Sequence, residues 1–444
     1  MKSDDALLAA WEETLARKRD AAAIFDTRGE VLRTFGDIES RARNLEEKIG
    51  PAAGQVQPID LGNHPDWPSW LLACLRRRVV ALPLEGTITP QQRSAALQIC
   101  TVREASEWGE RPPVLLKLTS GTTAAPRAIR FRSGQLLADC IQICDTMGIG
   151  PNDRNFGVIP FSHSYGFSNL VTPLLVRGVP FVLSRDRMPQ AMLDDLARTS
   201  ATVFPGMPVF YQAFCEMENP PPLPKLRLCI SAGAPLPLKV ARKFRGKFRR
   251  AIHSFYGSSE CGGICYDREA RLEEPGFVGG PMDGTKLELL DPDAPASRIR
   301  IQSAAAGDGY FPEPDAEKLG GGFFAPDDLL SRSDDGFRIV GRVSDVINVA
   351  GKKVNPAEVE AELMRFDGVR AAVVFGRESV LRNEEVAACV AASAGVRETE
   401  LLEFCRQRLS GWQVPKRIFF VDEIPVNERG KISRRELAER FGAR

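Results

Sequence analysis

The sequence has few of the residues that usually hold metals or build disulfide scaffolds. Histidine occurs three times in 444 residues, and the ten cysteines include no Cys-x-x-Cys pair. Three histidines are too few to complete metal sites, and cysteine is far too rare for a disulfide scaffold. Cys140 and Cys144 are four residues apart, as are Cys261 and Cys265, a spacing that places each pair on one face of a helix. We expect buried thiols in a reducing compartment.

An excess of one charge and long hydrophobic runs are also missing. The chain has 59 Lys+Arg and 58 Asp+Glu, a net charge of +1, which argues against binding nucleic acid through bulk charge. Apolar runs such as 71–75 and 170–176 stop at arginine, far short of the roughly 20 residues of a membrane span. Asp4 and Asp5 stand where a signal peptide is apolar. We expect a cytoplasmic protein with no integral membrane segment and no nucleic-acid partner.

Short apolar runs alternate with helical patterns along most of the chain, which favours α/β layers with a largely parallel sheet. Leu7, Leu8, Trp11 and Leu15 predict an amphipathic N-terminal helix, with Ser3 as a possible cap. A second helical pattern runs from residue 38 to Ile49 and ends before Gly50. The other expected helices are 91–100, 134–147 and 191–197, and the expected buried strands are 79–82, 114–118, 156–159, 179–183 and 226–230.

A domain boundary is predicted near residue 342. A Gly/Pro/Asp-rich stretch, 307–328, comes before it, followed by Asp334-Asp335-Gly336 as a turn between two short strands. After Asp345 the pattern restarts with strands, a helix over 356–366, strands over 370–375 and 386–390, a helix over 398–409 and a strand over 418–421. We therefore expect a large α/β domain over 1–341, a hinge over 342–345 and a small α+β domain over 346–444.

The strongest chemical signal is the segment 118–127, which is rich in hydroxyl groups and in small residues. Thr119, Ser120, Gly121, Thr122 and Thr123 follow a predicted strand, and Arg127 lies a few residues later. Small residues let the backbone approach a polyanion, and hydroxyl groups with a cation complete a phosphate cradle. The segment is not a Walker loop. Taken alone, a surface loop rich in Thr and Gly explains it equally well.

Further motifs in the same order resemble those of the adenylate-forming superfamily, which includes acyl- and aryl-CoA synthetases, luciferases and peptide-synthetase adenylation domains. The resemblance covers nearly the whole chain. Besides the phosphate loop, it rests on an early structural motif at 74–84 and on the segments 160–166, 231–236, 256–260, 327–329, 341–345, 351–358 and 430–434.

The resemblance implies a two-step ligase. A small carboxylic acid attacks the α-phosphorus of ATP to give acyl-AMP and pyrophosphate, with Mg²⁺ offsetting the charge. The acyl group then passes to a phosphopantetheine thiol, carried by CoA or by an acyl carrier protein. The implied fold is a layered N-terminal α/β domain with a small mobile C-terminal domain that rotates between the two steps.

The resemblance also implies roles for individual residues. Glu260 would bind Mg²⁺, and Lys431 would bridge the substrate carboxylate and the α-phosphate. His163 would shape the acyl pocket or contact the carboxylate, although a purely structural histidine is nearly as plausible. Gly262 and Gly263 would leave room for a bulky acyl group. The residues implied for the nucleotide are Thr119–Thr123 with Arg127, Gly233, Ala234, Pro235, Tyr256, Gly257, Ser258, Ser259, Asp328 and Arg342.

Several positions depart from the family pattern. In the phosphate loop, Ala124 and Ala128 replace the usual glycines and Arg127 replaces the usual lysine. Pro326-Asp327 replaces the usual threonine–glycine before the ribose aspartate. Alanine does not favour positive φ, whereas arginine keeps the charge and adds a planar fork. The large domain is also shorter than usual. These departures leave open a nucleotide-binding pseudo-enzyme without turnover, and an unrelated α/β protein is a third alternative.

The acid itself is not identified by the sequence. Residues 161–164 supply no aspartate for the ammonium group of an α-amino acid, so that class is disfavoured. Aromatic acids and medium-chain fatty acids both remain open.

Overall fold

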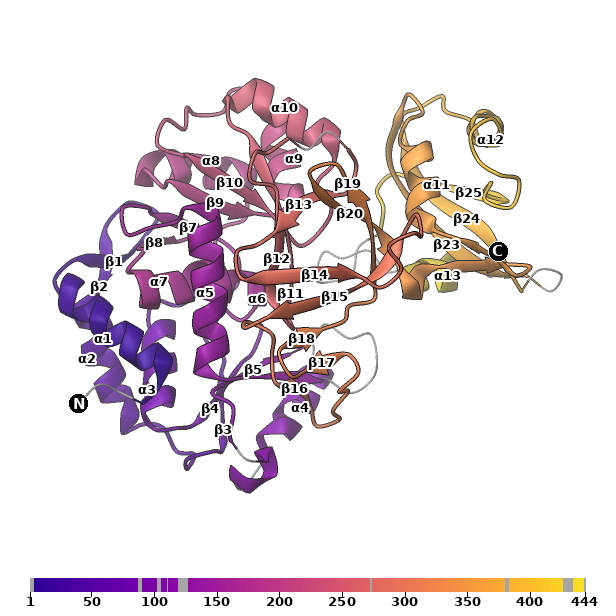
Figure 1. The fold of residues 1–444 in the computed structure, drawn as a ribbon. Coiled ribbons are helices and arrows are strands. Elements are labelled where there is room, and N and C mark those ends of the chain that lie inside the picture. The colour runs from indigo at the N-terminus through magenta and orange to yellow at the C-terminus, as the bar shows by residue number, and fades with distance from the viewer. Residues whose placement is uncertain are drawn as a thin grey trace. The chain divides into compact units, whose positions relative to one another are not determined.

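The computed structural model describes residues 4–86, 90–101, 105–109, 111–118, 127–271, 274–379, 383–425 and 434–442. The chain forms two compact units (Figure 1). The first contains Met1–Glu288, Arg300–Ala325 and Ser333–Phe337, and the second contains Leu289–Ile299, Pro326–Arg332 and Arg338–Arg444.

The larger sheet of the first unit has six parallel strands at its centre, in the order β11-β10-β9-β7-β8-β1. Antiparallel β2 pairs with β1 at one edge, and antiparallel β12 and β13 follow β11 at the other. Helices cover the central strands on both faces, so these strands read as continuous apolar runs. The strands are β1 (Ala22–Phe25), β2 (Val31–Thr34), β7 (Asn155–Gly157), β8 (Phe181–Leu183), β9 (Val203–Gly206), β10 (Leu228–Ser231), β11 (Ile252–Ser258), β12 (Gly262–Tyr266) and β13 (Phe277–Pro281).

A second, five-stranded sheet of this unit has the order β16-β6-β5-β4-β3. Strands β3, β4 and β5 are parallel, whereas β6 and β16 complete the sheet antiparallel to their neighbours. The strands are β3 (Val56–Ile59), β4 (Val80–Pro83), β5 (Leu115–Leu118), β6 (Ala128–Phe131) and β16 (Gly309–Phe311). The predicted strands over 79–82 and 114–118 correspond to β4 and β5.

Helices α1, α5 and α7 pack against one another beside the larger sheet (Figure 1). Helix α1 begins after Asp5, whose carboxylate accepts from the N–H groups of Leu7 and Leu8 at 3.0 Å. Asp5 is therefore the observed cap, because its side chain reaches the free N–H groups of the first turn. Helix α2 ends at Glu46 rather than near Gly50.

The helices of the first unit are α1 (Ala6–Lys18), α2 (Phe35–Glu46), α3 (Trp67–Arg76), α4 (Pro90–Gln98), α5 (Ser133–Met147), α6 (Ser164–Gly166), α7 (Thr172–Arg177), α8 (Pro189–Thr199), α9 (Pro208–Glu216) and α10 (Leu238–Phe248). Short non-α turns are η1 (Ile99–Thr101), η2 (Ala105–Trp108) and the π-helical η3 (Phe167–Val171).

Short strands fill the region between residues 285 and 342. Strand β15 is antiparallel to β18 and to β19, and the turn at 334–335 connects β19 to β20 as the sequence predicts. The strands are β14 (Thr285–Leu289), β15 (Ser297–Ser303), β17 (Leu319–Gly320), β18 (Phe323–Phe324), β19 (Asp328–Ser333) and β20 (Gly336–Arg342).

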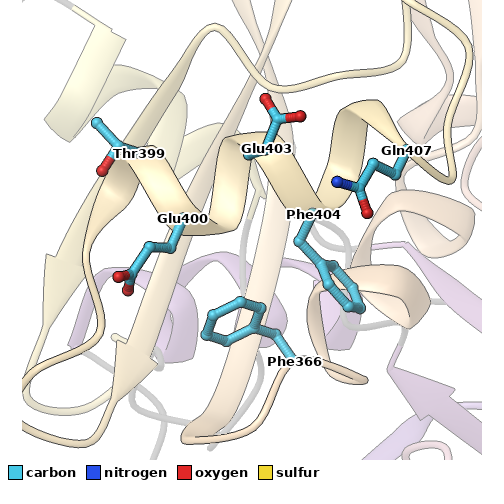
Figure 2. A pocket seen from close by; sticks show the side chains of 6 residues that line it. All are labelled: Phe366, Thr399, Glu400, Glu403, Phe404 and Gln407. Carbon is cyan, nitrogen blue, oxygen red and sulfur yellow. The ribbon is translucent and has the colours of Figure 1, made fainter.

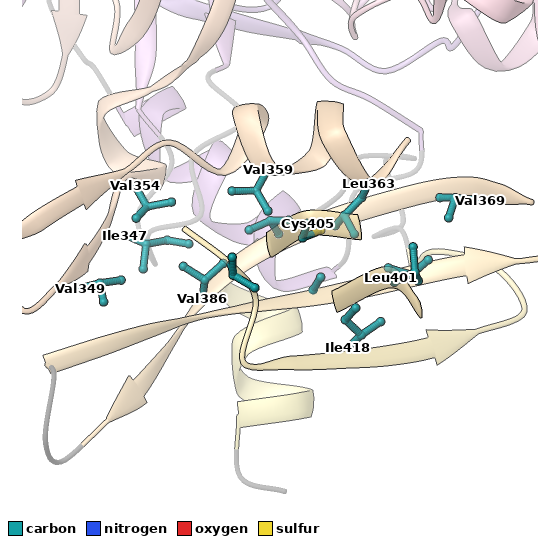
Figure 3. Packing of buried hydrophobic residues seen from close by; sticks show 14 residues of the cluster. Ile347, Val349, Val354, Val359, Leu363, Val369, Val386, Leu401, Cys405 and Ile418 are labelled. Atoms are coloured by element: carbon teal, nitrogen blue, oxygen red, sulfur yellow. The ribbon is translucent and has the colours of Figure 1, made fainter. Parts of the chain in front are cut away.

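The C-terminal part of the second unit folds around its own core (Figure 3). Buried valines of β24 pack there against Val359 and Leu363 of α11 and Leu401 of α12. The α+β pattern predicted after residue 345 is thus observed. The elements are η4 (Val343–Asp345), β21 (Ile347–Val349), β22 (Lys352–Val354), α11 (Pro356–Leu363), β23 (Val369–Ser379), β24 (Asn383–Ala392), α12 (Glu398–Arg406), β25 (Arg417–Val421) and α13 (Arg434–Gly442).

None of the ten cysteines is in a disulfide, and nine of them are buried. Cys140 and Cys144 share one face of α5, with their sulfur atoms 4.0 Å apart. Cys261 and Cys265 are buried as expected, but they lie on a turn and on β12 rather than on a helix. Within the described ranges, no group of three or more His, Cys, Asp or Glu is arranged to hold a metal ion. No helix in the same ranges is long and apolar enough to cross a membrane.

We expect the native protein to react slowly with thiol reagents. Burial raises the pKa of Cys74 and of Cys229 to about 12, so these groups are almost entirely thiols at pH 8 and the reactive thiolate is scarce. Titration with Ellman's reagent should modify at most Cys100, the one half-buried cysteine, and all ten after denaturation. Rapid reaction of several thiols in the native protein would contradict this burial pattern.

Candidate active site

The predicted nucleotide-binding segments of the first unit lie at the carboxyl ends of neighbouring parallel strands. Strand β10 ends at Ser231, and Gly233, Ala234 and Pro235 follow it. Strand β11 carries Tyr256 and leads to Glu260. Because β10 and β11 are paired in parallel, both segments reach the same edge of the sheet, where ligands bind in open α/β folds.

The turn that presents Glu260 depends on glycine. Gly257 pairs with Gly263 in the β11–β12 hairpin, and a Cβ on Gly257 would lie 2.8 Å from the carbonyl oxygen of Gly262. Gly262 has φ +69° and a Cβ there would meet a carboxylate oxygen of Asp139 at 2.0 Å. The Ser258 hydroxyl also accepts from the Cys261 N–H at 3.1 Å. Only glycine fits both positions without moving the backbone.

Glu260 is connected to the second sheet through Tyr310. The Tyr310 hydroxyl donates to Oε1 of Glu260 at 3.2 Å, and the Glu260 carbonyl accepts from the Gly307 N–H at 2.8 Å. Tyr310 comes from β16, which pairs with β6. A carboxylate oxygen is the ligand type that Mg²⁺ prefers, so the chemistry of Glu260 fits its predicted role.

Arg127 joins the same cluster just after the segment predicted to bind phosphate. Its guanidinium carbon lies 4.1 Å from the centroid of the Tyr310 ring, within cation–π distance. One terminal nitrogen donates to the carbonyl of Glu313 at 3.2 Å. Its Nε is buried without a hydrogen-bond partner in the described part of the chain. A cation with an unused donor is suited to an anionic ligand.

Tyr310 was not predicted as a site residue. Burial, together with the neighbouring Glu260 carboxylate, raises the pKa of Tyr310 well above its usual value, so the phenol stays protonated and donates to Glu260. Arg127, Tyr310 and Glu260 form one contact chain, and we refer to them as the Arg–Tyr–Glu cluster. The only sequence signal for Tyr310 was its place in the Gly/Pro/Asp-rich stretch.

A second group of buried charges lies beneath this cluster. Lys117 of β5 is 4% exposed, with its ammonium 4.5 Å from the Phe131 ring centroid. Burial lowers the pKa of Lys117, while the charges of Asp139 and Glu260 oppose that shift. Asp139 accepts from the Gly263 N–H at 3.1 Å and from the Ser168 hydroxyl at 2.5 Å. Asp139 therefore fixes the start of β12, immediately after Glu260.

His163 and Tyr256 are both part of the local structure: His163 caps a short helix, and Tyr256 is buried in a strand. His163 precedes the short helix α6, and its Nδ1 accepts from the Tyr165 N–H at 3.2 Å. Gly166 is required there, because a Cβ would lie 2.1 Å from the carbonyl oxygen of Pro160. Tyr256 is 7% exposed within β11. The capping contact accounts for His163 structurally, and its role toward substrate stays a prediction.

The second unit contributes Asp328 and Arg342 as a pair. Asp328 begins β19 and is 9% exposed, and its Oδ1 accepts from Nε of Arg342 at 2.8 Å. The pair places a carboxylate and a guanidinium side by side, the groups needed for ribose hydroxyls and phosphate oxygens. Their contact with a nucleotide stays a prediction.

Six predicted site residues lie outside the described residues: Thr119, Ser120, Gly121, Thr122, Thr123 and Lys431. Arg434 follows the Lys431 segment and is firmly held. It donates to Asp345 at 2.7 Å, to Glu360 at 2.7 Å and to the Val374 carbonyl at 3.0 Å. These contacts fix the side chain of Arg434 within the second unit.

The structure changes two interpretations of the sequence, one about Gly262 and Gly263 and one about Ala128. A Cβ on Gly263 would lie 2.3 Å from the sulfur of Met282, and the equivalent space at Gly262 is filled by Asp139. The interpretation that these glycines leave room for the acyl group is therefore wrong. Ala128 lies in strand β6 and does not have a positive φ, so alanine causes no backbone strain there. This removes one ground for a pseudo-enzyme.

A shallow hollow in the second unit is separate from these residues. It lies on α12 beside Phe366, and Figure 2 shows the two phenylalanine rings at its base. It contains none of the predicted site residues. Its lining consists of Phe366, Thr399, Glu400, Glu403, Phe404 and Gln407.

Replacing Arg127 tests its predicted contact with ATP. We expect Arg127→Ala to raise the KM for ATP about tenfold or more, the usual effect of losing a hydrogen bond to a charged group. The KM for the carboxylic acid should change little, because the two substrates bind at different groups. Arg127→Lys keeps the charge, so its KM for ATP should lie between the values of the wild type and of Arg127→Ala. Initial-rate measurements of pyrophosphate release check this, and an unchanged KM for ATP would show a solvated arginine.

The chain is similar in sequence and in structure to known proteins. A family model described as AMP-binding enzyme matches residues 103–299, and a model described as AMP-binding enzyme C-terminal domain matches residues 358–431. A feruloyl-CoA synthase from an Amycolatopsis species is 28% identical over 490 aligned positions, covering 98% of this chain and 99% of the relative. Since those positions outnumber the residues of this chain, the relative contains segments that this chain lacks.

Two further proteins are similar over most of their length. A 3,4-dihydroxybenzoate–[aryl-carrier protein] ligase from Bacillus anthracis is 28% identical, with 76% of each chain covered. The o-succinylbenzoate coenzyme A synthetase from Bacillus subtilis, solved in complex with ATP and magnesium ion, has a TM-score of 0.83 and 20% identity. That likeness covers 96% of this chain and 98% of the other. The structural likeness confirms the predicted fold class.

Proposed function

This chain belongs to the AMP-binding enzymes of the adenylate-forming superfamily, and from that premise we propose that it activates an aromatic carboxylic acid and transfers it to a phosphopantetheine thiol. ATP and Mg²⁺ are required for the first step. The Arg–Tyr–Glu cluster is the observation that carries the proposal. It places a cation over the ring of one buried tyrosine and a carboxylate at the hydroxyl of the same tyrosine, and the Nε of the cation has no partner among the described residues.

In the first step, a carboxylate oxygen of the acid attacks the α-phosphorus of ATP, and the bond to pyrophosphate breaks. Arg127 binds the departing phosphates, and Glu260 would hold the magnesium ion, which would offset their charge. Tyr256 contacts the adenine, and Asp328 accepts from the ribose hydroxyls. Lys431 neutralises the oxygens that approach each other, a task that suits a flexible point charge.

In the second step, the thiol sulfur attacks the acyl carbon of the adenylate and AMP leaves. The thiol proton is released and a thioester forms. Because the attacking thiol is neutral, Lys431 is not needed in this step to bring two anions together, and the hairpin of β21 and β22 is the proposed guide for the thiol-bearing arm. The two steps thus depend on different segments of the second unit.

An aromatic acid is favoured over a fatty acid by the relatives. The feruloyl-CoA synthase and the 3,4-dihydroxybenzoate ligase are both named for aromatic acids. The relatives also include a long-chain-fatty-acid–CoA ligase from Bacillus subtilis, 28% identical over 74% of this chain. Fatty acids are therefore the comparison class for the experiment.

A substrate panel tests the proposal. The enzyme is incubated with ATP, Mg²⁺, one acid and either CoA or a holo carrier protein, and thioesters are followed by mass spectrometry. Hydroxylated benzoic and cinnamic acids should give thioesters at rates well above octanoate and decanoate. Faster turnover of the fatty acids would overturn the aromatic assignment. Absence of any thioester, with acyl-AMP accumulating, would overturn the transfer step.

A further inference from the structure

The charge of the chain is balanced overall but strongly uneven in one region. Residues 219–259 contain nine Lys and Arg and no Asp or Glu. Most of these cations gather on α10 and just beyond it, from Lys239 to Arg250. Helix α10 lies on the outer side of the first unit, next to α9 (Figure 1). A chain with a net charge of +1 thus carries one strongly basic surface.

The cations of α10 divide into two sets. Lys243 pairs with Glu216 at 2.8 Å, and Lys247 donates to the Cys215 carbonyl at 3.0 Å, so these two hold α10 against α9. Lys239, Arg242 and Arg245 are exposed, and in the described part of the chain their side chains show no ion pair or hydrogen bond. Spaced three residues apart, they form one stripe along the helix, opposite the buried Val240 and Phe244. We call these three residues the basic stripe.

The stripe favours the helix that carries it only at Arg245, which lies in the last turn, where the helix dipole attracts a cation. Lys239 lies in the first turn, where the positive end of the helix dipole disfavours a cation, and no acidic residue offsets it. Like charges three and four residues apart, such as Lys239 and Lys243, also repel each other. The repulsion between these cations decreases when an anionic surface covers the stripe.

The position of α10 connects the stripe to the active site. The helix begins at Leu238, directly after the predicted adenine-contact segment 231–236, and it returns the chain from β10 to the parallel strand β11. Its first turn therefore lies at the carboxyl-end edge of the sheet, where the site is located. From Lys239 to Arg245 the helix rises about 9 Å, so the three cations are spread along α10 rather than converging on one small anion.

We propose that the basic stripe Lys239–Arg242–Arg245 is the docking surface for an acidic carrier protein whose phosphopantetheine arm is the thiol acceptor. The inference rests on the proposed function, because it assumes a thiol acceptor, and it decides between the two acceptors in favour of the protein. An acidic helix of the carrier lies along α10 and is held by charge complementarity. A membrane surface is disfavoured because the stripe has no exposed apolar side chains between its cations.

Charge reversal on the stripe tests the proposal. The variant Lys239→Glu/Arg242→Glu/Arg245→Glu is compared with wild type for loading of a purified, net-negative holo aryl-carrier protein at low salt. We expect at least a tenfold rise in the KM for the carrier with kcat nearly unchanged, because complementary surface charges act mainly on association. The wild-type KM should rise with added NaCl, whereas the KM of the variant should depend less on salt.

Matched controls separate docking from folding and from chemistry. The variant Arg28→Glu/Lys48→Glu/Lys286→Glu changes the net charge equally on exposed residues of the same unit and should load the carrier like wild type. Both variants should keep wild-type ATP–pyrophosphate exchange and wild-type thioester formation with free pantetheine, which has no protein surface.

Three outcomes overturn the inference: an unchanged KM for the carrier in the stripe variant, an equal loss in the control variant, or loading of CoA by wild type without loading of the carrier. Failure of the proposed function is distinct from these, since it would abolish exchange in wild type.

Discussion

Lys431→Ala should lose adenylation by about 10²–10³-fold while converting preformed acyl-AMP to thioester at nearly the wild-type rate. The loss is the usual effect of removing one group that stabilises charge in a transition state. In the first step two anions approach each other, so Lys431 contributes there. In the second step a neutral thiol attacks the acyl carbon, so no second anion has to be brought to the phosphate and Lys431 is not needed for that purpose.

The two half-reactions are measured separately, as acid-dependent pyrophosphate release and as thioester formation from synthetic acyl-AMP. Lys416→Ala serves as the matched control, since Lys416 is exposed in the same unit and outside the proposed site. An equal loss in both half-reactions of Lys431→Ala would show a structural role rather than a charge acting in adenylation.

Gly351→Leu should block thioester formation while leaving pyrophosphate release intact. Gly351 and Ala350 form the two-residue turn between β21 and β22, with φ +84° and +50°, the pattern of a type I′ hairpin. The Asn348 side chain accepts from the Gly351 N–H at 3.0 Å. A leucine at this tip adds bulk where we propose that the thiol-bearing arm passes.

Gly351→Ala separates bulk from backbone strain. A Cβ at residue 351 meets no described atom within 4 Å, so alanine and leucine have the same positive-φ cost, about 1–2 kcal/mol. The alanine variant should keep most thioester formation, and the leucine variant should lose it. Equal loss in both variants would assign the effect to the turn conformation, and no loss in either would remove the guiding role of the hairpin.

The elements that the sequence predicts best are those whose burial repeats along the chain. Strands β7, β8 and β10 are buried at every position, and each was visible as an apolar run. Strand β9 is equally buried but was not predicted. Helix α5 was found from its spacing of apolar residues and ends at Gly148 with φ +63°. The end of α2 was missed, because Ile49 keeps the helical spacing after the helix has stopped at Glu46.

Site residues that belong to a contiguous motif could be predicted from the sequence. Site residues that come together only in the folded chain could not. Glu260 and Arg127 were found in motifs, whereas Tyr310, which contacts both, lies 50 residues from Glu260 on a three-residue strand. Lys117 resembles an interruption in an apolar strand, and the charge that most opposes the lowering of its pKa comes from Asp139 on α5. Such side chains meet only through tertiary packing, which leaves no local periodicity in the sequence.

The most direct test of the account is ATP–pyrophosphate exchange by the wild-type protein without any thiol, across the acid panel. We predict exchange that requires both Mg²⁺ and an acid, with aromatic acids the most active, and that is lost in Lys431→Ala. A protein that binds ATP but shows no acid-dependent exchange with any acid would contradict the assignment as an adenylate-forming ligase.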